Sequence, residues 1–147
     1  MAGFTYKMQN ILDIKYKLET QAKTAYADAN HKLTEEELKL KSIFDDINKY
    51  EDEIREIYAD KFDINRLRWC SEAIEYKKEE AKKQEKAIEK AKRNVELARI
   101  KLNEMMVERK THEKLKERAF EEFKHEMADQ EKRAVDELVS FKFNKSE

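Results

Sequence analysis

The side chains that could bind a metal ion or act as a nucleophile are three histidines, His31, His112 and His125, and one cysteine, Cys70. Glu122 and His125 have the i, i+3 spacing of carboxylate-bridged di-iron bundles, but such a site needs two of these pairs and two further glutamates on facing helices. In a chain with 33 acidic residues, we interpret the lone pair as part of a solvated helix face. Cys70 has no Cys or His at ligand spacing and is expected to pack as a small hydrophobic residue near a turn.

The 147 residues include one glycine and no proline. Sheets and barrels use these residues for tight turns and bulges, and phosphate-binding loops need glycine. An ordinary α/β enzyme is therefore excluded. Because there is also no Gly-x-Ser-x-Gly motif, we expect no catalytic residue, no metal, no cofactor and no small-molecule ligand. Charged residues make up 44% of the chain with a net charge of only -1, which indicates a folded helical protein with a thin core.

The charge pattern and the lack of long apolar segments restrict the location and the partners. No uncharged run approaches the ~18 residues that span a bilayer, and no secretory signal is visible, so with a lone cysteine we expect a soluble cytoplasmic protein. The near-zero net charge argues against nucleic acid or an anionic membrane as the main partner. The basic stretch 77–118 is interleaved with glutamates, as on the exposed face of a coiled coil.

Apolar residues recur at helical spacing in two arms. From residue 40 the first arm has the strict 3-4 spacing of a left-handed coiled coil, carried by Leu40, Ile43, Ile47, Tyr50, Ile54 and Ile57. Nearer its start the spacing is 3-4-4, through Ile11, Ile14, Leu18, Ala22, Ala25, Ala29 and Leu33. We therefore place a first helical arm at about 4–58. A capping-box pattern at Thr34 and Glu37 could break it, but a continuous helix is favoured because no glycine or proline precedes it.

A second arm is expected at about 67–143. Its apolar residues, with Lys77 and Gln84 as polar exceptions, are Ile74, Ala81, Ile88, Ala91, Val95, Ala98, Leu102 and Met105. Beyond His112 the spacing loosens, through Leu115, Ala119, Phe123, Met127, Ala134, Leu138 and Phe141. The spacing fails at about 59–66, where Asp and Asn side chains can end a helix. The sequence thus predicts an all-α fold, a single-domain antiparallel two-helix coiled coil, or helical hairpin.

Aromatic residues gather near both ends of the chain. A turn near residue 62 or 63 places Phe4 opposite about Glu121 and leaves the longer second arm overhanging. A two-helix hairpin cannot cover all the rings at that end, which are Phe4, Tyr6, Tyr16, Phe120, Phe123, Phe141 and Phe143. We expect an exposed apolar docking surface there. The alternative is a locally thicker core, made by a C-terminal tail that folds back.

Two segments resemble a known family. The opening segment from Phe4 to Lys15 resembles the start of flagellar export proteins of the FliJ family. The segment from Glu113 to Arg118, Phe123 and the 131–137 segment resemble the C-terminal arm of that family. The chain length and the two-arm plan agree as well.

The resemblance implies a non-enzymatic coiled-coil stalk of the flagellar type III export apparatus, cytoplasmic and peripherally associated with its membrane-bound part. The expected partners are a hexameric export ATPase, the cytoplasmic domain of the export gate and export chaperones. The end with both termini would enter the ATPase through Phe4, Met8, Ile11, Leu12, Leu115, Phe123 and Met127. Exposed residues after the turn would contact the gate, and these are Trp69, Ile74 and Tyr76. Leu12 is turned about 100° from Ile11, so we expect Ile11 in the seam and Leu12 free for a partner.

Two other functions remain open at this stage. The chain could be an export chaperone or scaffold that binds secreted substrates, or their chaperones, through the coiled-coil surface. A stalk subunit of a proton-pumping ATPase is a third candidate, but we would expect such a subunit to have more chain around its stalk.

Overall fold

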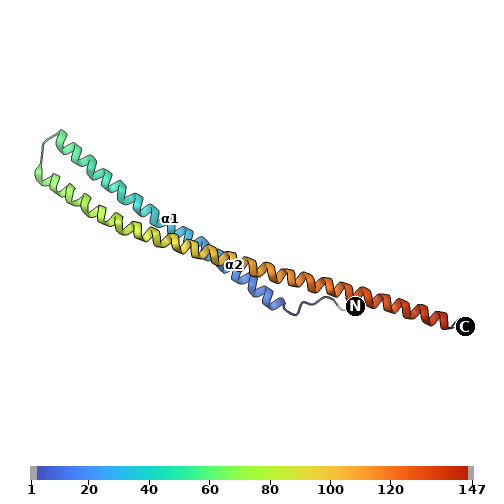
Figure 1. The fold of residues 1–147 in the computed structure, drawn as a ribbon. Coiled ribbons are helices and arrows are strands. Elements are labelled where there is room, and N and C mark those ends of the chain that lie inside the picture. Colours follow the sequence, from blue (N-terminus) through green and yellow to red (C-terminus); the bar gives the residue numbers. More distant parts are fainter. Residues whose placement is uncertain (1–2, 146–147) are drawn as a thin grey trace. The chain divides into compact units, whose positions relative to one another are not determined.

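A computed structural model describes residues 3–145 of the chain. Two helices, α1 (Gln9–Ala59) and α2 (Ile64–Lys145), pack against each other as an antiparallel helical hairpin (Figure 1). Within the described residues there is no strand. The predicted all-α hairpin is confirmed. Its contacts divide it into two units: the termini unit (Met1–Thr20 and Asn103–Glu147) and the turn unit (Gln21–Leu102).

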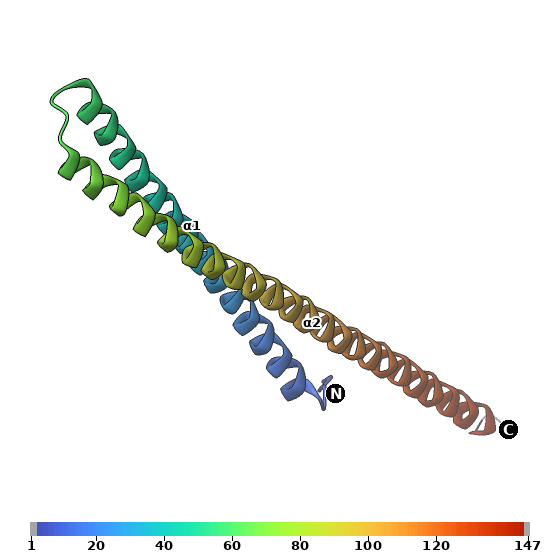
Figure 2. The same ribbon diagram turned by 60° about the vertical axis from the view of Figure 1, so that its left-hand side comes forward.

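The two helices meet at a short turn, visible in both ribbon views (Figures 1 and 2). Asp63 caps α2, because its Oδ1 accepts hydrogen bonds from the backbone N–H groups of Asn65 (3.0 Å) and Arg66 (3.3 Å), which would otherwise lack partners in the first helical turn. α1 begins at Gln9 rather than near Phe4, and its first turn is closed by bonds from Ile11 and Leu12 to the Met8 carbonyl.

α1 is continuous through Thr34, as predicted. The Thr34 hydroxyl does not cap a new helix; it donates to the Asn30 carbonyl one turn earlier, at 3.1 Å. A hydroxyl bonded in this way is satisfied within the helix, so the capping-box pattern is coincidental.

From Ala29 onwards the turn unit has the seam that the sequence predicts, whereas Ala25, expected inside, is exposed and Tyr26 is half-buried. Inward residues on both helices follow strict 3-4 spacing, and the buried ones are Ala22, Ile47, Ile57, Cys70, Ile74, Ala81, Ile88 and Ala91. The two predicted polar exceptions also face inward. Lys77 forms an ion pair with Asp46 on α1 at 3.2 Å, and Gln84 donates to the Glu36 carbonyl at 2.8 Å and to the Glu36 carboxylate. Apolar burial therefore holds this unit together, and the two inward polar residues add contacts across the seam.

The seam of the termini unit differs from the prediction. Ile11, Ile14 and Leu115, expected inside, are exposed. Leu12, which is 1% exposed, faces α2 instead. The remaining inward positions carry mainly polar side chains, namely Lys15, Glu19, Arg109, His112 and Lys116. The prediction was wrong because it assumed that apolar residues mark the seam, whereas here the heptad of the turn unit continues through polar residues.

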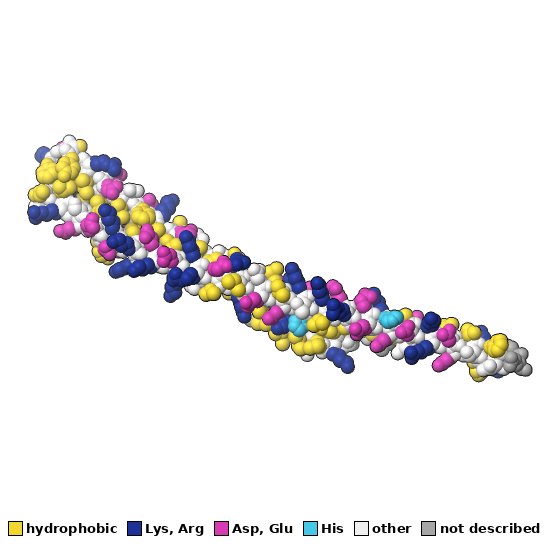
Figure 3. Space-filling model, in the orientation of Figure 1, with side chains coloured by type: hydrophobic (Ala, Val, Ile, Leu, Met, Phe, Trp, Pro, Cys, Tyr) yellow, Lys and Arg dark blue, Asp and Glu magenta, His cyan; other side chains and the backbone are white. Residues whose placement is uncertain are grey.

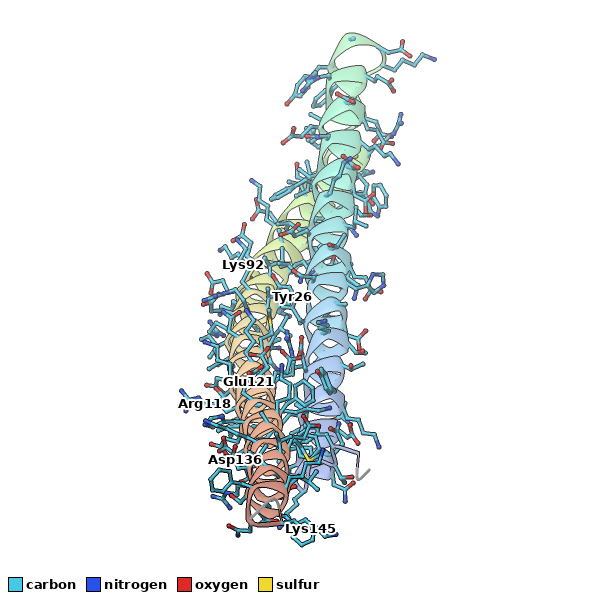
Figure 4. All side chains as sticks on the ribbon, turned by 90° about the vertical axis from the view of Figure 1, so that its right-hand side faces the viewer. Tyr26, Lys92, Arg118, Glu121, Asp136 and Lys145 are labelled. Atoms are coloured by element: carbon cyan, nitrogen blue, oxygen red, sulfur yellow. The ribbon has the colours of Figure 1, made fainter. Side chains whose placement is uncertain are left out.

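The C-terminal part of α2 extends beyond the paired region. All residues from 128 to 145 are exposed, and α2 is helical up to Lys145. Asp136 and Lys145 mark this stretch in Figure 4. The expected overhang is confirmed, and the alternative of a tail that folds back is wrong for these residues.

Candidate docking surfaces

The termini unit carries an apolar flank, which we define as Ile11, Ile14, Leu18 and Leu115. Ile14 is 53% exposed, Ile11 and Leu115 are also exposed, and Leu18 is half-buried. Ile11, Leu18 and Leu115 each directly precede an inward residue, which directs them to the same side of the seam. In the turn unit, Glu53 and Arg66 hold the equivalent positions and form an ion pair at 2.7 Å. The flank therefore combines side chains of both helices into one surface.

An aromatic cluster lies in the same unit. The ring of Phe4 is 5.1 Å from that of Phe120 and 5.4 Å from that of Phe123, between centroids. The ammonium of Lys124 lies over Phe120 at 4.8 Å. The predicted opposition of Phe4 and residue 121 is thus confirmed. Beside the cluster is an open groove of about 410 Å³, lined by Phe4, Gln9, Leu12, Tyr16, Glu113, Lys116, Glu117 and Phe120.

A polar network lies behind the flank. Glu19, 4% exposed, accepts hydrogen bonds from Arg109 at 2.5 Å (Nε to Oε2) and 3.3 Å (Nη2 to Oε1). Arg109 also bonds Glu113 at 3.2 Å, and the Tyr16 hydroxyl donates to Glu113 at 2.5 Å. The bond from Tyr16 lowers the pKa of Glu113 and raises that of Tyr16. Lys15 pairs with Glu108 at 2.9 Å. These bonds provide partners for Lys15, Glu19 and Arg109, whereas the buried Nδ1 of His112 has no hydrogen-bond partner in the structure.

The residues predicted to bind the ATPase all belong to this unit, but they differ in accessibility. Met8, Ile11 and Leu115 are exposed, and Phe4, Phe123 and Met127 are half-buried. Leu12 is buried, so the expectation that it is free for a partner is wrong. Ile14 was not predicted as a surface residue, although its position one turn from Ile11 gives the same helix face. Binding itself stays a prediction for all of them.

Exposed aromatic residues lie on one face of the turn unit, near the turn. Trp69 and Tyr76 are exposed and lie seven residues apart, on one face of α2. The Trp69 ring packs edge-on against Tyr50 of α1, with 5.6 Å between centroids. Ile74 is only 8% exposed, so the expectation that it forms part of an exposed surface is wrong: it lies in the seam.

Hydrophobic side chains gather over the turn itself (Figure 3). Tyr58 and Phe62 are exposed, and their rings lie 5.5 Å apart. The sequence analysis did not single them out, although two aromatic residues flanking a predicted turn are a usable signal.

The candidate metal and thiol residues are placed as follows. Among residues 3–145, no group of three or more His, Cys, Asp or Glu could hold a metal ion. Glu122 and His125 are both exposed on α2. Cys70 is fully buried near the turn, as expected, and burial raises the pKa of its thiol. The described residues contain no helix with the length and hydropathy needed to span a membrane.

The hairpin defines a two-helix coiled-coil protein. The sequence matches the family model of the flagellar FliJ protein over residues 4–147. The chain therefore belongs to the FliJ family, a component of type III export. No curated protein matches the sequence. Among solved structures, a protein described as a YscO homolog, CT670 from Chlamydia trachomatis, has the same fold, with a TM-score of 0.78, 20% identity, and coverage of 95% of this chain and 94% of that one.

Proposed function

We propose that this chain is a non-enzymatic stalk of the flagellar type III export apparatus, which docks its termini unit into the hexameric export ATPase and couples the ATPase to the export gate. The observation that carries the proposal is the exposed apolar flank. Membership of the FliJ family supports a place in the export apparatus, and the flank supplies a surface for a protein partner. In this role the chain acts in the cytoplasm, beside the membrane-bound gate.

The exposure of the apolar flank to water is energetically unfavourable for the isolated chain. Full burial of an Ile or Leu side chain contributes about 1.5–3 kcal/mol, and Ile11, Ile14 and Leu115 forgo much of it. In the same part of the hairpin, the termini unit encloses Glu19 and Arg109, and hydrogen bonds must offset the desolvation of these two charged groups. A partner that covers the flank recovers the lost burial. Contiguous exposed apolar residues of this kind usually mark a docking surface.

The neighbouring aromatic cluster extends this surface. Phe120 is exposed, and Phe4 and Phe123 are half-buried. Buried aromatic anchors often dominate interface energies. We assign Phe4, Met8, Ile11, Ile14, Leu115, Phe123 and Met127 to the ATPase-facing surface. Leu12 supports it from inside the seam.

The gate-facing role rests on the aromatic side of the turn unit. Trp69 and Tyr76 present two large rings to solvent, and each has a polar group that suits a partly wet interface. Ile74 acts here only as a seam residue. Contact with export chaperones is a further role that the family suggests.

The experiment compares two substitutions of exposed aliphatic residues on α1. Ile14→Asp changes the apolar flank, and Leu38→Asp changes a turn-unit residue that is 60% exposed. Both should leave the free energy of unfolding within about 0.5 kcal/mol of the parent. Only Ile14→Asp should weaken binding to the purified hexameric ATPase, by tenfold or more, and reduce its stimulation. Equal effects of both variants, or no effect of Ile14→Asp, would contradict the proposal.

The same variants distinguish the proposed function from the alternative, which is a chaperone or scaffold that binds secreted substrates or their chaperones. A specific feature favours that alternative: the overhang exposes Val135, Leu138, Val139, Phe141 and Phe143. If Ile14→Asp leaves ATPase stimulation intact and truncation after Met127 abolishes capture of an export chaperone, the chaperone function is supported instead. For the gate, Tyr76→Asp should reduce pull-down of the gate's cytoplasmic domain and spare the ATPase.

A further inference from the structure

The beginning of α1 carries two stripes that could face α2. The observed stripe consists of Leu12, Lys15 and Glu19, and it continues into Ala22 with 3-4 spacing. The other stripe is the α1 part of the apolar flank, Ile11, Ile14 and Leu18, which reaches Ala22 after one more four-residue step. At 100° per residue the two stripes lie about 100° apart around the helix. A four-residue step of this kind changes the local winding of a coiled coil without breaking the helix.

Apolar burial alone favours the second stripe. Rotating the first turns of α1 would enclose Ile14, now 53% exposed, and release Lys15 and Glu19 to water. The observed rotation therefore needs a specific interaction. In the termini unit, the ion pair between Glu19 and Arg109 joins α1 to α2, and its carboxylate is buried. Its two hydrogen bonds, at 2.5 and 3.3 Å, fix the guanidinium against both carboxylate oxygens.

A second set of contacts locks the guanidinium in place. Glu113, one turn further along α2, accepts a hydrogen bond from Arg109 and another from Tyr16 on α1. Arg109 therefore bonds to carboxylates on both helices, and the hydrogen bond from Tyr16 to Glu113 is a further link between α1 and α2. In some proteins, paired and hydrogen-bonded buried charges select one packing although they add little stability.

We infer that Arg109 is a positioning residue: its pair with Glu19 holds the first turns of α1 in the rotation that keeps Ile11, Ile14 and Leu18 exposed. Without the guanidinium, the Glu19 carboxylate would lose the two hydrogen bonds that hold it at the seam, and its burial would become costly relative to a position in water. Ile14 and Leu18 would then take its place. The rotation is a property of the free chain. Its consequence for ATPase docking rests on the proposed function.

The test measures thiol reactivity in the full chain, with Cys70 replaced by Ser so that each variant has one cysteine. With Arg109 present, Ile14→Cys should react rapidly with a maleimide and Leu12→Cys should be protected. Adding Arg109→Leu should reverse this order, slowing Ile14→Cys by tenfold or more and exposing Leu12→Cys. Asp13→Cys is the matched control, since position 13 faces solvent in both rotations. No ATPase is present, so this result is independent of the proposed function.

Three outcomes can be told apart. Reversal of the two rates supports the inference, and exchange of the pair, Glu19→Arg with Arg109→Glu, should restore the original order. Unchanged rates in Arg109→Leu would overturn it. Rapid reaction at both positions 12 and 14 would also overturn it, because the ion pair would then hold the unit folded instead of selecting a rotation. A circular dichroism spectrum of each variant checks that the helices remain.

Discussion

In the turn unit the inward positions of α1 include Ile47 and Ile57, whereas in the termini unit the equivalent positions carry Lys15 and Glu19. Both units continue one 3-4 spacing, so the backbone geometry is the same and only the side chains differ. The seam of the turn unit is mainly apolar, whereas the termini unit leaves Ile11, Ile14 and Leu115 outside its seam. The first arrangement stabilises the hairpin, and the second leaves apolar side chains exposed. The turn unit therefore holds the fold together, and the termini unit carries the surface that we propose for binding a partner.

The largest expected effect comes from a charge in the seam of the turn unit. Ile57, 2% exposed, packs beside the turn. Ile57→Asp would enclose an unpaired carboxylate and cost about 4 kcal/mol, a large part of the stability of a small domain. Urea denaturation followed by circular dichroism measures the loss. If Ile57→Asp proved as mild as Ile14→Asp in the termini unit, the contrast between the units would be lost.

Acid should also act on the turn unit, through Glu36. This buried carboxylate bonds Lys32 at 3.0 Å and Gln84 across the seam, and hydrogen bonds from these two residues lower its pKa from 4.5 to about 2. A lowered folded-state pKa stabilises the fold above pH 4.5, and the contribution is lost as the pH falls towards 2. We expect Glu36→Gln to be less stable than the parent at pH 7.

The measurement for Glu36 is urea denaturation of both proteins between pH 7 and pH 2. The difference in unfolding free energy should be constant down to about pH 5 and shrink between pH 4.5 and 2. A difference that did not change with pH would show that the Glu36 carboxylate does not stabilise the turn unit as an anion.

The smallest effect is expected at the turn. Asp63→Ala removes the side-chain acceptor for the Asn65 and Arg66 N–H groups and should cost about 1 kcal/mol, which lowers the melting temperature by about 3 °C. Asp60→Ala is the matched control in the same turn, with no expected change. Equal shifts for both variants would indicate an effect of charge rather than of capping.

Sequence reasoning could predict the hairpin, the turn and the seam of the turn unit because each depends on local pattern: 3-4 spacing at Ile47 and Ile57, and a break at Asp63. It could not predict the seam of the termini unit. There the inward side chains are polar, and their burial depends on a partner such as Arg109, which lies 90 residues from Glu19 in sequence. Hydrophobicity assigned Ile11 to the inside and Leu12 to the outside, and the structure reverses both.

The same limit applies to the candidate binding residues. Trp69 and Tyr76 could be assigned to a surface from their spacing, since seven residues return to the same face of a helix. Ile74 lies between them in sequence, and its apolar side chain is compatible with either an exposed docking surface or the seam. Only the packing of α1 against α2 decides which, and it places Ile74 in the seam.

The overhang of α2 is held by helical cooperativity rather than by packing. In an isolated helix the first turn is costly to nucleate in water. Here the paired part of α2 provides that nucleus, and each further residue adds only a propagation step. Lys142 and Lys145 in the last turn also counter the negative end of the helix dipole. A molecule that binds the overhang thus meets a segment already ordered, and loses less affinity to conformational entropy than it would with a free peptide of the same sequence.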